Sequence, residues 1–262
     1  MEEATELKEK AYKVSKISRR LEDCETFKDS IITPQHLTLQ QSYRITSAPL
    51  GVTFSSCILQ HNRFVADTKD KEPDVLFVGD SLVQLLHQFE IWRQLFSPLH
   101  ALNFGIGGDA TQNILWRIQH GELENIKPKV IVLWVGTNNH GHTAEQVAGG
   151  IEAIVHLMIQ QQPLAKIIVL GLLPRGKDPN QLRVKNAQVN ELVKEMVKDV
   201  SNASYLDVDP GFVNSDGTIS HNDMYDYLHL TRHAYSSVCQ VIHARVQQLL
   251  AEAASDPPNP DI

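Results

Sequence analysis

The chain has 262 residues, of which 42% are hydrophobic and 21% are charged, and its formal net charge at pH 7 is −7. This composition is typical of a globular protein, and the negative charge argues against nucleic acid as a partner. No segment reaches the roughly 18 unbroken apolar residues of a membrane span, and the charged start of the chain lacks the apolar core of a secretory signal. The three cysteines are scattered without a C-x-x-C pair. They predict no disulfide framework and favour a reducing, cytoplasmic location.

Residues 1–60 differ in pattern from the rest of the chain. Their basic and acidic side chains balance, so the net negative charge lies in residues 61–262. Apolar residues at helical spacing predict an amphipathic helix over 2–23, and 24–60 reads as a linker or a partly disordered segment. We therefore predict an N-terminal extension over 1–60, a folded domain over 61–252, and a flexible, proline-rich tail over 253–262.

From residue 61 onward, short apolar runs alternate with helical patterns. The runs predict five strands, at 74–79, 99–104, 129–135, 166–172 and 204–208. Helical periodicity between them predicts helices near 82–95, 110–120, 143–162, 179–200 and 232–252. Strands that are apolar throughout and separated by helices predict an α/β fold, with a parallel sheet covered on both faces. Ligands of such sheets bind beyond the carboxyl ends of the strands.

Ser81 directly follows the first predicted strand, within Gly79-Asp80-Ser81-Leu82. At a strand-to-helix turn, free backbone N–H groups and the helix dipole favour negative charge, which suits a nucleophile. Taken alone, however, this position fits a helix N-cap serine better than a nucleophile.

A glycine cluster follows the second predicted strand, in the stretch 103–110. Clustered glycines let the backbone approach a ligand and aim N–H groups at it, so the Gly108 N–H is a candidate donor. The stretch also matches the dinucleotide-binding pattern G-x-G-x-x-A, with Glu122 and Glu124 downstream. That pattern belongs to the first strand-to-helix turn of its unit, and this is the second, so the dinucleotide interpretation is a minor alternative.

Polar groups also follow the third strand and precede the last helix. The Asn138 amide can donate into the crevice, although a tight turn explains a single Asn more simply. Asp226 and His229 are three residues apart in a predicted turn, which can set a carboxylate against an imidazole and raise its basicity. His140 and His142 resemble a metal pair, but no further ligand completes a set, so we predict no metal and no cofactor.

Each of these features is weak alone, but together they form the parts of acyl-transfer catalysis. Ser81 is the candidate nucleophile, His229 the base, and Asp226 the carboxylate that orients it. The candidate oxyanion hole consists of the N–H groups of Ser81 and Gly108 and the Asn138 amide.

The same residues, in the same order, resemble the motif set of the SGNH (GDSL-type) hydrolases. Within that family, the stretch from His61 to about Leu250 is similar to the catalytic alpha subunits of intracellular platelet-activating factor acetylhydrolase Ib, nearer the alpha2 than the alpha1 type. The similarity is strongest at Asp74–Asp80, Asn103–Asp109 and Val169–Gly176. Residues 1–60 do not match the usual short N-terminal segment of that group and look like a substituted leader.

The resemblance implies a flavodoxin-like α/β/α sandwich and a hydrolase that removes the sn-2 acetyl group of platelet-activating factor and related short-acyl phospholipids. It also implies a homodimer or a heterodimer with a related catalytic subunit, and association with a WD40-repeat regulatory subunit. Two alternatives stay open: a partner-binding subunit whose catalysis is dispensable, and a carbohydrate or other small-ester deacetylase.

Three residues adjacent to the candidate catalytic groups, Leu82, Thr137 and Leu228, are hypothesised to wall the acyl pocket. Their bulk would favour a short acyl group such as acetyl, because one methylene in an apolar pocket changes binding by only about 1–3 kcal/mol and longer chains need a steric clash to be excluded. The simpler explanation is that they are ordinary core side chains.

Overall fold

The computed structural model describes residues 54–255, so the predicted helix over 2–23, most of the predicted linker and the end of the tail lie outside the described residues. The first described helix, α2 (Phe54–Asp70), spans the predicted domain boundary at residue 61. Phe64 of this helix stacks on Phe104, with 4.5 Å between ring centroids. The end of the expected linker is therefore a helix that packs on the sheet.

The sheet contains five parallel strands in the order β2-β1-β3-β4-β5, which confirms the predicted α/β architecture. This is the flavodoxin-like order, in which β1 and β3 flank the point where the strand order reverses. The strands are β1 (Val75–Gly79), β2 (Ala101–Gly105), β3 (Val130–Trp134), β4 (Lys166–Leu170) and β5 (Ala203–Leu206).

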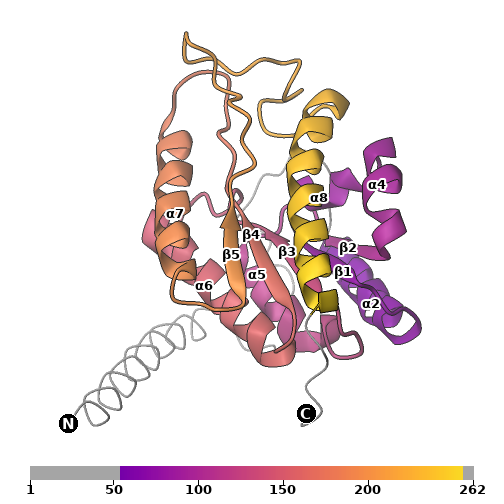
Figure 1. Ribbon diagram of the computed structural model, residues 1–262. Coiled ribbons are helices and arrows are strands. Elements are labelled where there is room, and N and C mark those ends of the chain that lie inside the picture. The colour runs from indigo at the N-terminus through magenta and orange to yellow at the C-terminus, as the bar shows by residue number, and fades with distance from the viewer. Residues whose placement is uncertain (1–53, 256–262) are drawn as a thin grey trace, which may run out of the picture. The chain divides into compact units, whose positions relative to one another are not determined.

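Helices cover both faces of the sheet (Figure 1). Alternating side chains of the central strands pack into two separate hydrophobic cores, one on each face. In β3, Ile131 and Leu133 join the core beneath one helical layer, whereas Val132 and Trp134 join the core beneath the other. The first layer contains α2, α5 (Thr111–Arg117), α6 (Ala144–Gln161) and α7 (Gln181–Val197). The second contains α3 (Ser81–Leu86), α4 (Glu90–Leu95) and α8 (Arg232–Ser255). No helix within 54–255 is long and apolar enough to cross a membrane.

Three predicted elements differ from the structure. The helix expected over 82–95 is two helices, because Phe89 is extended and its ring packs on Tyr235 of α8, with 4.9 Å between centroids. The second strand starts at Ala101, because the preceding residues form a 3-10 turn, η2 (Ser97–Leu99), that ends at the left-handed His100. The helix expected over 110–120 changes after Arg117 into a π-helical turn, η3 (Ile118–Glu122).

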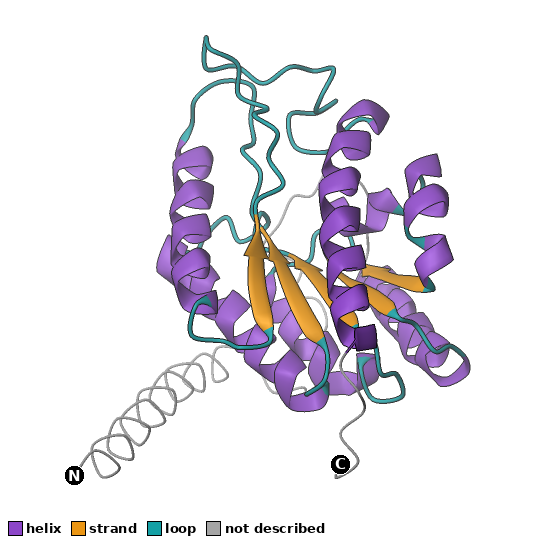
Figure 2. Cartoon of the chain, in the orientation of Figure 1, coloured by secondary structure: helices purple, strands orange, loops and turns teal. Residues whose placement is uncertain are grey.

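Long loops follow the carboxyl ends of β4 and β5, and they are drawn in teal in Figure 2. The second of them carries Asp226 and His229 before α8 begins. Since Ser81 follows β1 and Asn138 follows β3, the predicted site residues all lie at the edge of the sheet where parallel α/β folds bind ligands.

Candidate active site

Ser81, Asp226 and His229 meet at this edge of the sheet, although Ser81 and His229 are 148 positions apart in the chain. The Nε2 atom of His229 lies 2.9 Å from the Ser81 hydroxyl oxygen. Its Nδ1 atom lies 2.6 Å from Asp226 Oδ2. The imidazole thus bridges a hydroxyl and a carboxylate, an arrangement in which the ring can accept the hydroxyl proton while the carboxylate holds its tautomer.

The loop that carries Asp226 and His229 is shaped by its own sequence. Asp226 Oδ1 accepts the backbone N–H groups of Leu228 at 3.1 Å and His229 at 2.7 Å, as in an Asx turn. An antiparallel bridge between Met224 and Leu230 closes the loop. Partial burial raises the pKa of Asp226, but the hydrogen bonds from His229 outweigh it, and the pKa lies below the ordinary 3.8. The carboxyl group is therefore ionised beside the ring.

Ser81 is the first residue of α3, and the helix is capped by the residue before it. Asp80 Oδ1 accepts the Leu82 N–H at 2.9 Å, so the N-cap is Asp80 and the N-cap interpretation of Ser81 is wrong. Burial raises the pKa of Asp80 to about 7 against the opposing effect of that hydrogen bond. The Tyr235 hydroxyl donates to the Leu82 carbonyl at 2.7 Å, which ties α8 to the start of α3. Ser81 is thus held on a fixed turn.

The loop after β2 passes directly beside Ser81. A Cβ atom on Gly107 would lie 3.8 Å from the Ser81 Cβ and 2.9 Å from Gln84 Oε1. Gly108 has φ of +86°, a left-handed conformation that strains any other residue. Within residues 54–255 no group accepts its N–H, so this donor is available to a ligand.

The Asn138 amide belongs to the same corner, because its Nδ2 donates to the Asp109 carbonyl at 3.0 Å. That bond uses one amide hydrogen and leaves the other for a ligand. The only non-glycine residues with positive φ in 54–255 are His100 and Tyr227, so a left-handed turn does not explain the asparagine. The next residue, Asn139, accepts the Thr111 N–H at 3.1 Å and anchors this loop to α5.

A buried ion cluster lies beneath the Gly108 loop. Arg117 Nη1 donates to Asp109 Oδ2 at 2.6 Å, and its Nε and Nη2 donate to the two carboxylate oxygens of Glu122 at 2.8 and 2.9 Å. Nη2 also donates to the Phe104 carbonyl at 2.6 Å, and His61 of α2 contacts Glu122 at 2.9 Å. Burial raises the pKa of Asp109 to about 6, although Arg117 opposes the shift. The cluster fixes the turn that carries the Gly108 N–H.

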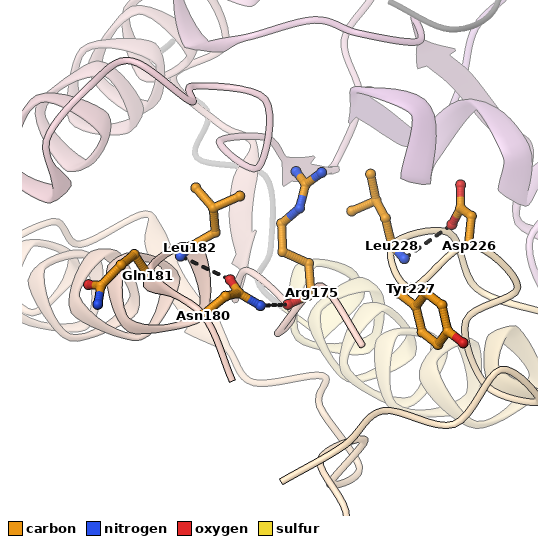
Figure 3. A pocket seen from close by; sticks show the side chains of 8 residues that line it. Arg175, Asn180, Gln181, Leu182, Asp226, Tyr227 and Leu228 are labelled. Carbon is orange, nitrogen blue, oxygen red and sulfur yellow. Dashed lines mark hydrogen bonds between the residues drawn. The ribbon is translucent and has the colours of Figure 1, made fainter. Parts of the chain in front are cut away.

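A cavity of about 300 Å³ opens beside the Asp226 loop (Figure 3). One wall comes from the loop after β4 and the start of α7, with Arg175 and Leu182, and the other comes from Asp226, Tyr227 and Leu228. The two loops are joined where Gly176 N–H donates to the Tyr227 carbonyl at 2.7 Å.

The three residues expected to wall an acyl pocket have different surroundings. Leu228 lines the cavity. Thr137 is buried, and its carbonyl and hydroxyl oxygens accept Arg175 Nη1 at 2.9 and 3.1 Å. Leu82 is only 2% exposed and packs within the core between the sheet and α8, away from the residues that line the cavity.

Two groups of this site were not expected from the sequence. Arg117 follows Thr111 and Ile114 at three-residue spacing on the buried face of α5, and an arginine on such a face is a signal of a buried ion pair. Arg175 sits in a loop, where no periodic pattern singles it out.

The minor alternatives find no support in the arrangement. Glu122, the acidic residue that a ribose would need, is already held by Arg117 and His61. A Cβ atom on Gly105 would lie 2.2 Å from the Gln84 backbone nitrogen, so this glycine allows α3 to pack closely. Within 54–255 no group of three His, Cys, Asp or Glu side chains could hold a metal ion, His140 and His142 included.

This flavodoxin-like fold, with serine, histidine and aspartate in contact at the carboxyl edge of the sheet, is that of an ester hydrolase. The chain belongs to the GDSL-like lipase/acylhydrolase family, whose family model matches residues 77–236.

More specifically, the chain is 67% identical over 192 residues to human platelet-activating factor acetylhydrolase IB subunit alpha1, covering 73% of this chain and 83% of that one. It is 68% identical over 197 residues to the chicken subunit alpha2, covering 75% of this chain and 86% of that one. These identities do not separate the two types. A GDSL-like lipase from Bacteroides thetaiotaomicron shares the fold, with a TM-score of 0.57, 16% identity, and coverage of 74% of this chain and 98% of that one.

Proposed function

We propose that this chain is a serine esterase that hydrolyses the sn-2 acetyl ester of platelet-activating factor and related short-acyl phospholipids. The relatives named platelet-activating factor acetylhydrolase support the substrate class. The single observation that carries the reaction type is the chain of contacts from Asp226 through His229 to the Ser81 hydroxyl, at 2.6 and 2.9 Å.

In the proposed mechanism, the Ser81 oxygen attacks the ester carbonyl while His229 Nε2 takes the hydroxyl proton. The carbon–oxygen bond of the tetrahedral intermediate then breaks, and His229 returns the proton to the departing alcohol. A water activated by His229 releases acetate and restores Ser81. Asp226 is ionised, so it stabilises the imidazolium formed in each step and holds Nδ1–H toward itself.

The negative charge of the intermediate needs donors at the same point. The Ser81 N–H at the start of α3, the Gly108 N–H and the second hydrogen of the Asn138 amide are the proposed donors. Because the ion cluster and the Asp109 carbonyl hold two of them before substrate arrives, little reorganisation accompanies the reaction.

The direct test is acetate release from labelled platelet-activating factor by the full chain and its variants. We expect Ser81→Ala to abolish turnover, and Asn138→Ala to lower kcat by roughly 10²–10³-fold with the fold retained, as loss of one oxyanion donor does. The exposed Ser215→Ala is the matched control and should keep full activity. Undiminished acetate release by folded Ser81→Ala protein would refute the assignment.

We propose that the acyl group sits against Leu228 and Thr137. The lining of the cavity supports Leu228, whereas Leu82 is buried in the core and does not line the cavity. Leu228→Ala should raise kcat/KM for butanoyl relative to acetyl substrates by about 10-fold or more, since an apolar contact of this size is worth about 1–3 kcal/mol. The measurement is a series of esters of increasing acyl length, and an unchanged length profile would reject Leu228 as a wall.

We also propose that the chain acts in the cytoplasm and pairs with a second copy or a related catalytic subunit, together with a WD40-repeat regulatory subunit. The names of the relatives, which call them subunits, support a partner. A serine-reactive fluorophosphonate probe separates this esterase from a purely partner-binding subunit, because it labels only a competent nucleophile. Comparison with acetylated sugars separates it from a carbohydrate deacetylase.

A further inference from the structure

The cavity beside the Asp226 loop is larger than an acetyl group requires. Its volume is about 300 Å³, roughly ten times the space of one water molecule in the liquid and within the usual range of ligand pockets. An acetyl group has only three heavy atoms, so most of this space is available to the alcohol part of an ester.

Arg175 is the one basic side chain among the residues that line the cavity. Only its Nη1 is engaged, on the carbonyl and hydroxyl oxygens of Thr137. Nothing in the described part of the chain accepts hydrogen bonds from its Nε or Nη2. Figure 3 shows its guanidinium group standing between the Leu182 and Leu228 side chains. The arginine therefore presents unused donors beside apolar walls.

The backbone of Arg175 is held firmly, so its side chain starts from a fixed point. Its carbonyl accepts Asn180 Nδ2 at 2.7 Å and Arg183 Nε at 3.0 Å. Arg183 also donates to the carbonyls of Gly217 at 2.6 Å and Lys177 at 2.8 Å. This loop is thus held at Arg175 and at Lys177 just after it before any ligand binds.

The carboxylate on the opposite wall does not neutralise this arginine by contact. Asp226 directs its two oxygens at His229 and the Leu228 N–H, and no hydrogen bond joins it to Arg175. Asp80, the other acid that acts on Arg175 electrostatically, is buried at the start of α3. A cation with free donors remains at the cavity wall.

We propose that Arg175 forms a phosphate subsite, which binds the phosphate oxyanion attached to the alcohol part of the substrate. The proposal rests on the proposed function. In a glycerophospholipid the phosphate group is attached to the carbon next to the one that carries the sn-2 ester. Arg175 contacts Thr137, the residue before the proposed oxyanion donor Asn138, so its free donors lie near the place where such a phosphate would follow the reacting ester. A guanidinium group suits this role because its planar donors match phosphate oxygens.

The test compares two acetyl esters on the full chain: 1-alkyl-2-acetyl-glycerophosphocholine and 1-alkyl-2-acetylglycerol, which lacks the phosphate. We expect Arg175→Gln to lower kcat/KM for the phosphate-bearing ester by about 10–100-fold, the effect of losing charge-assisted hydrogen bonds. The neutral ester should change by less than about 3-fold. Arg175→Lys should retain part of the preference for the phosphate-bearing ester, because lysine keeps the positive charge but lacks the planar, two-pronged donor geometry of the guanidinium group.

The ratio of the two kcat/KM values is the readout, since a general loosening of the Thr137–Asn138 loop lowers both values equally. Lys177→Gln removes the same charge from an exposed neighbouring position and should leave the ratio unchanged. Inorganic phosphate tests whether the free ion binds at the same place. If phosphate inhibits neutral-ester hydrolysis by the unaltered chain and Arg175→Gln abolishes this inhibition, the subsite is supported. If the variant is inhibited equally, the result counts against the subsite.

An equal loss on both esters, or no change in the ratio, would overturn the subsite and leave the esterase assignment intact. By contrast, if the unaltered chain hydrolyses the neutral ester but not the phosphocholine ester, the proposed substrate class fails and the subsite fails with it.

Discussion

Asp80 combines two functions in one buried side chain at the start of α3. It caps the helix by accepting the Leu82 N–H. Because Ser81 is the next residue, the same cap fixes Ser81 at the first position of α3. Its burial raises its pKa to about 7. A carboxyl group that holds its proton more tightly in the folded state than in the unfolded chain makes folding more favourable at low pH.

Asp80→Asn should therefore change the pH dependence of stability. In the unaltered chain, the contribution of Asp80 is present near pH 4 and is lost as the pH rises toward 7, so the free energy of unfolding should fall by roughly 2–3 kcal/mol more between pH 5 and pH 8 than in the variant. Asn retains a good N-cap, so the helix survives. Urea unfolding of both proteins at the two pH values measures the difference. Parallel behaviour would show that Asp80 is not titrating in this range.

The segment formed by α5 and η3 shows how an element of unusual geometry serves the site. The π-helical turn contains Gly121 at φ of +102° and brings Glu122 back against Arg117. Arg117 in turn holds Asp109, whose carbonyl accepts the Asn138 amide. The position of two proposed oxyanion donors thus depends on an ion cluster one layer below them.

Arg117→Met should destabilise the fold by about 3–5 kcal/mol, because it leaves Asp109 and Glu122 buried without their partner. On any acetyl ester the variant should also show a fall in kcat that is larger than its change in KM, since the Gly108 turn loses its anchor. Arg93→Met is the control, because the Arg93–Glu90 pair is exposed and such pairs contribute about 1 kcal/mol or less. Chemical unfolding and steady-state kinetics give both readouts. Equal stability of the two variants would contradict the role of the cluster.

At the scale of the whole molecule, α2 is an integral part of the folded domain. Phe64 is 7% exposed, packs on Phe104 and lies under Arg117, whose guanidinium carbon is 5.4 Å from the ring centroid. His61 joins the ion cluster from the same helix. A helix that lies outside the family match over residues 77–236 therefore completes the core beneath the site.

A chain that begins at Thr53 should fold cooperatively and keep its esterase activity. A chain that begins at Glu72 lacks α2. Its free energy of unfolding should be lower by at least roughly 3–5 kcal/mol, the cost of truncating one core phenylalanine. Urea midpoints and ester hydrolysis compare the two. Phe64→Ala in the full chain tests the same contact without a truncation. Matching midpoints for both truncated chains would show that α2 only rests on the surface.

The local patterns of the sequence were sufficient for the sheet and for the candidate chemistry. Apolar runs at the strands follow from burial on both faces, and that pattern is repeated in every central strand. The polar residues at strand ends, Ser81 and Asn138, lie at the same edge of the sheet because parallel strands all end there. Such periodicities depend on neighbours in the chain, and they can be read without coordinates.

Contacts between distant segments could only be decided by the tertiary structure. The break before α4 depends on the contact between Phe89 and Tyr235, and the burial of Leu82 depends on where α8 lies. Arg175 and the Arg117 cluster draw their roles from partners far away in sequence. The periodicities of helices and strands are visible in the order of the residues. The pairing of buried charges and the walls of a cavity, by contrast, arise only when the layers pack together.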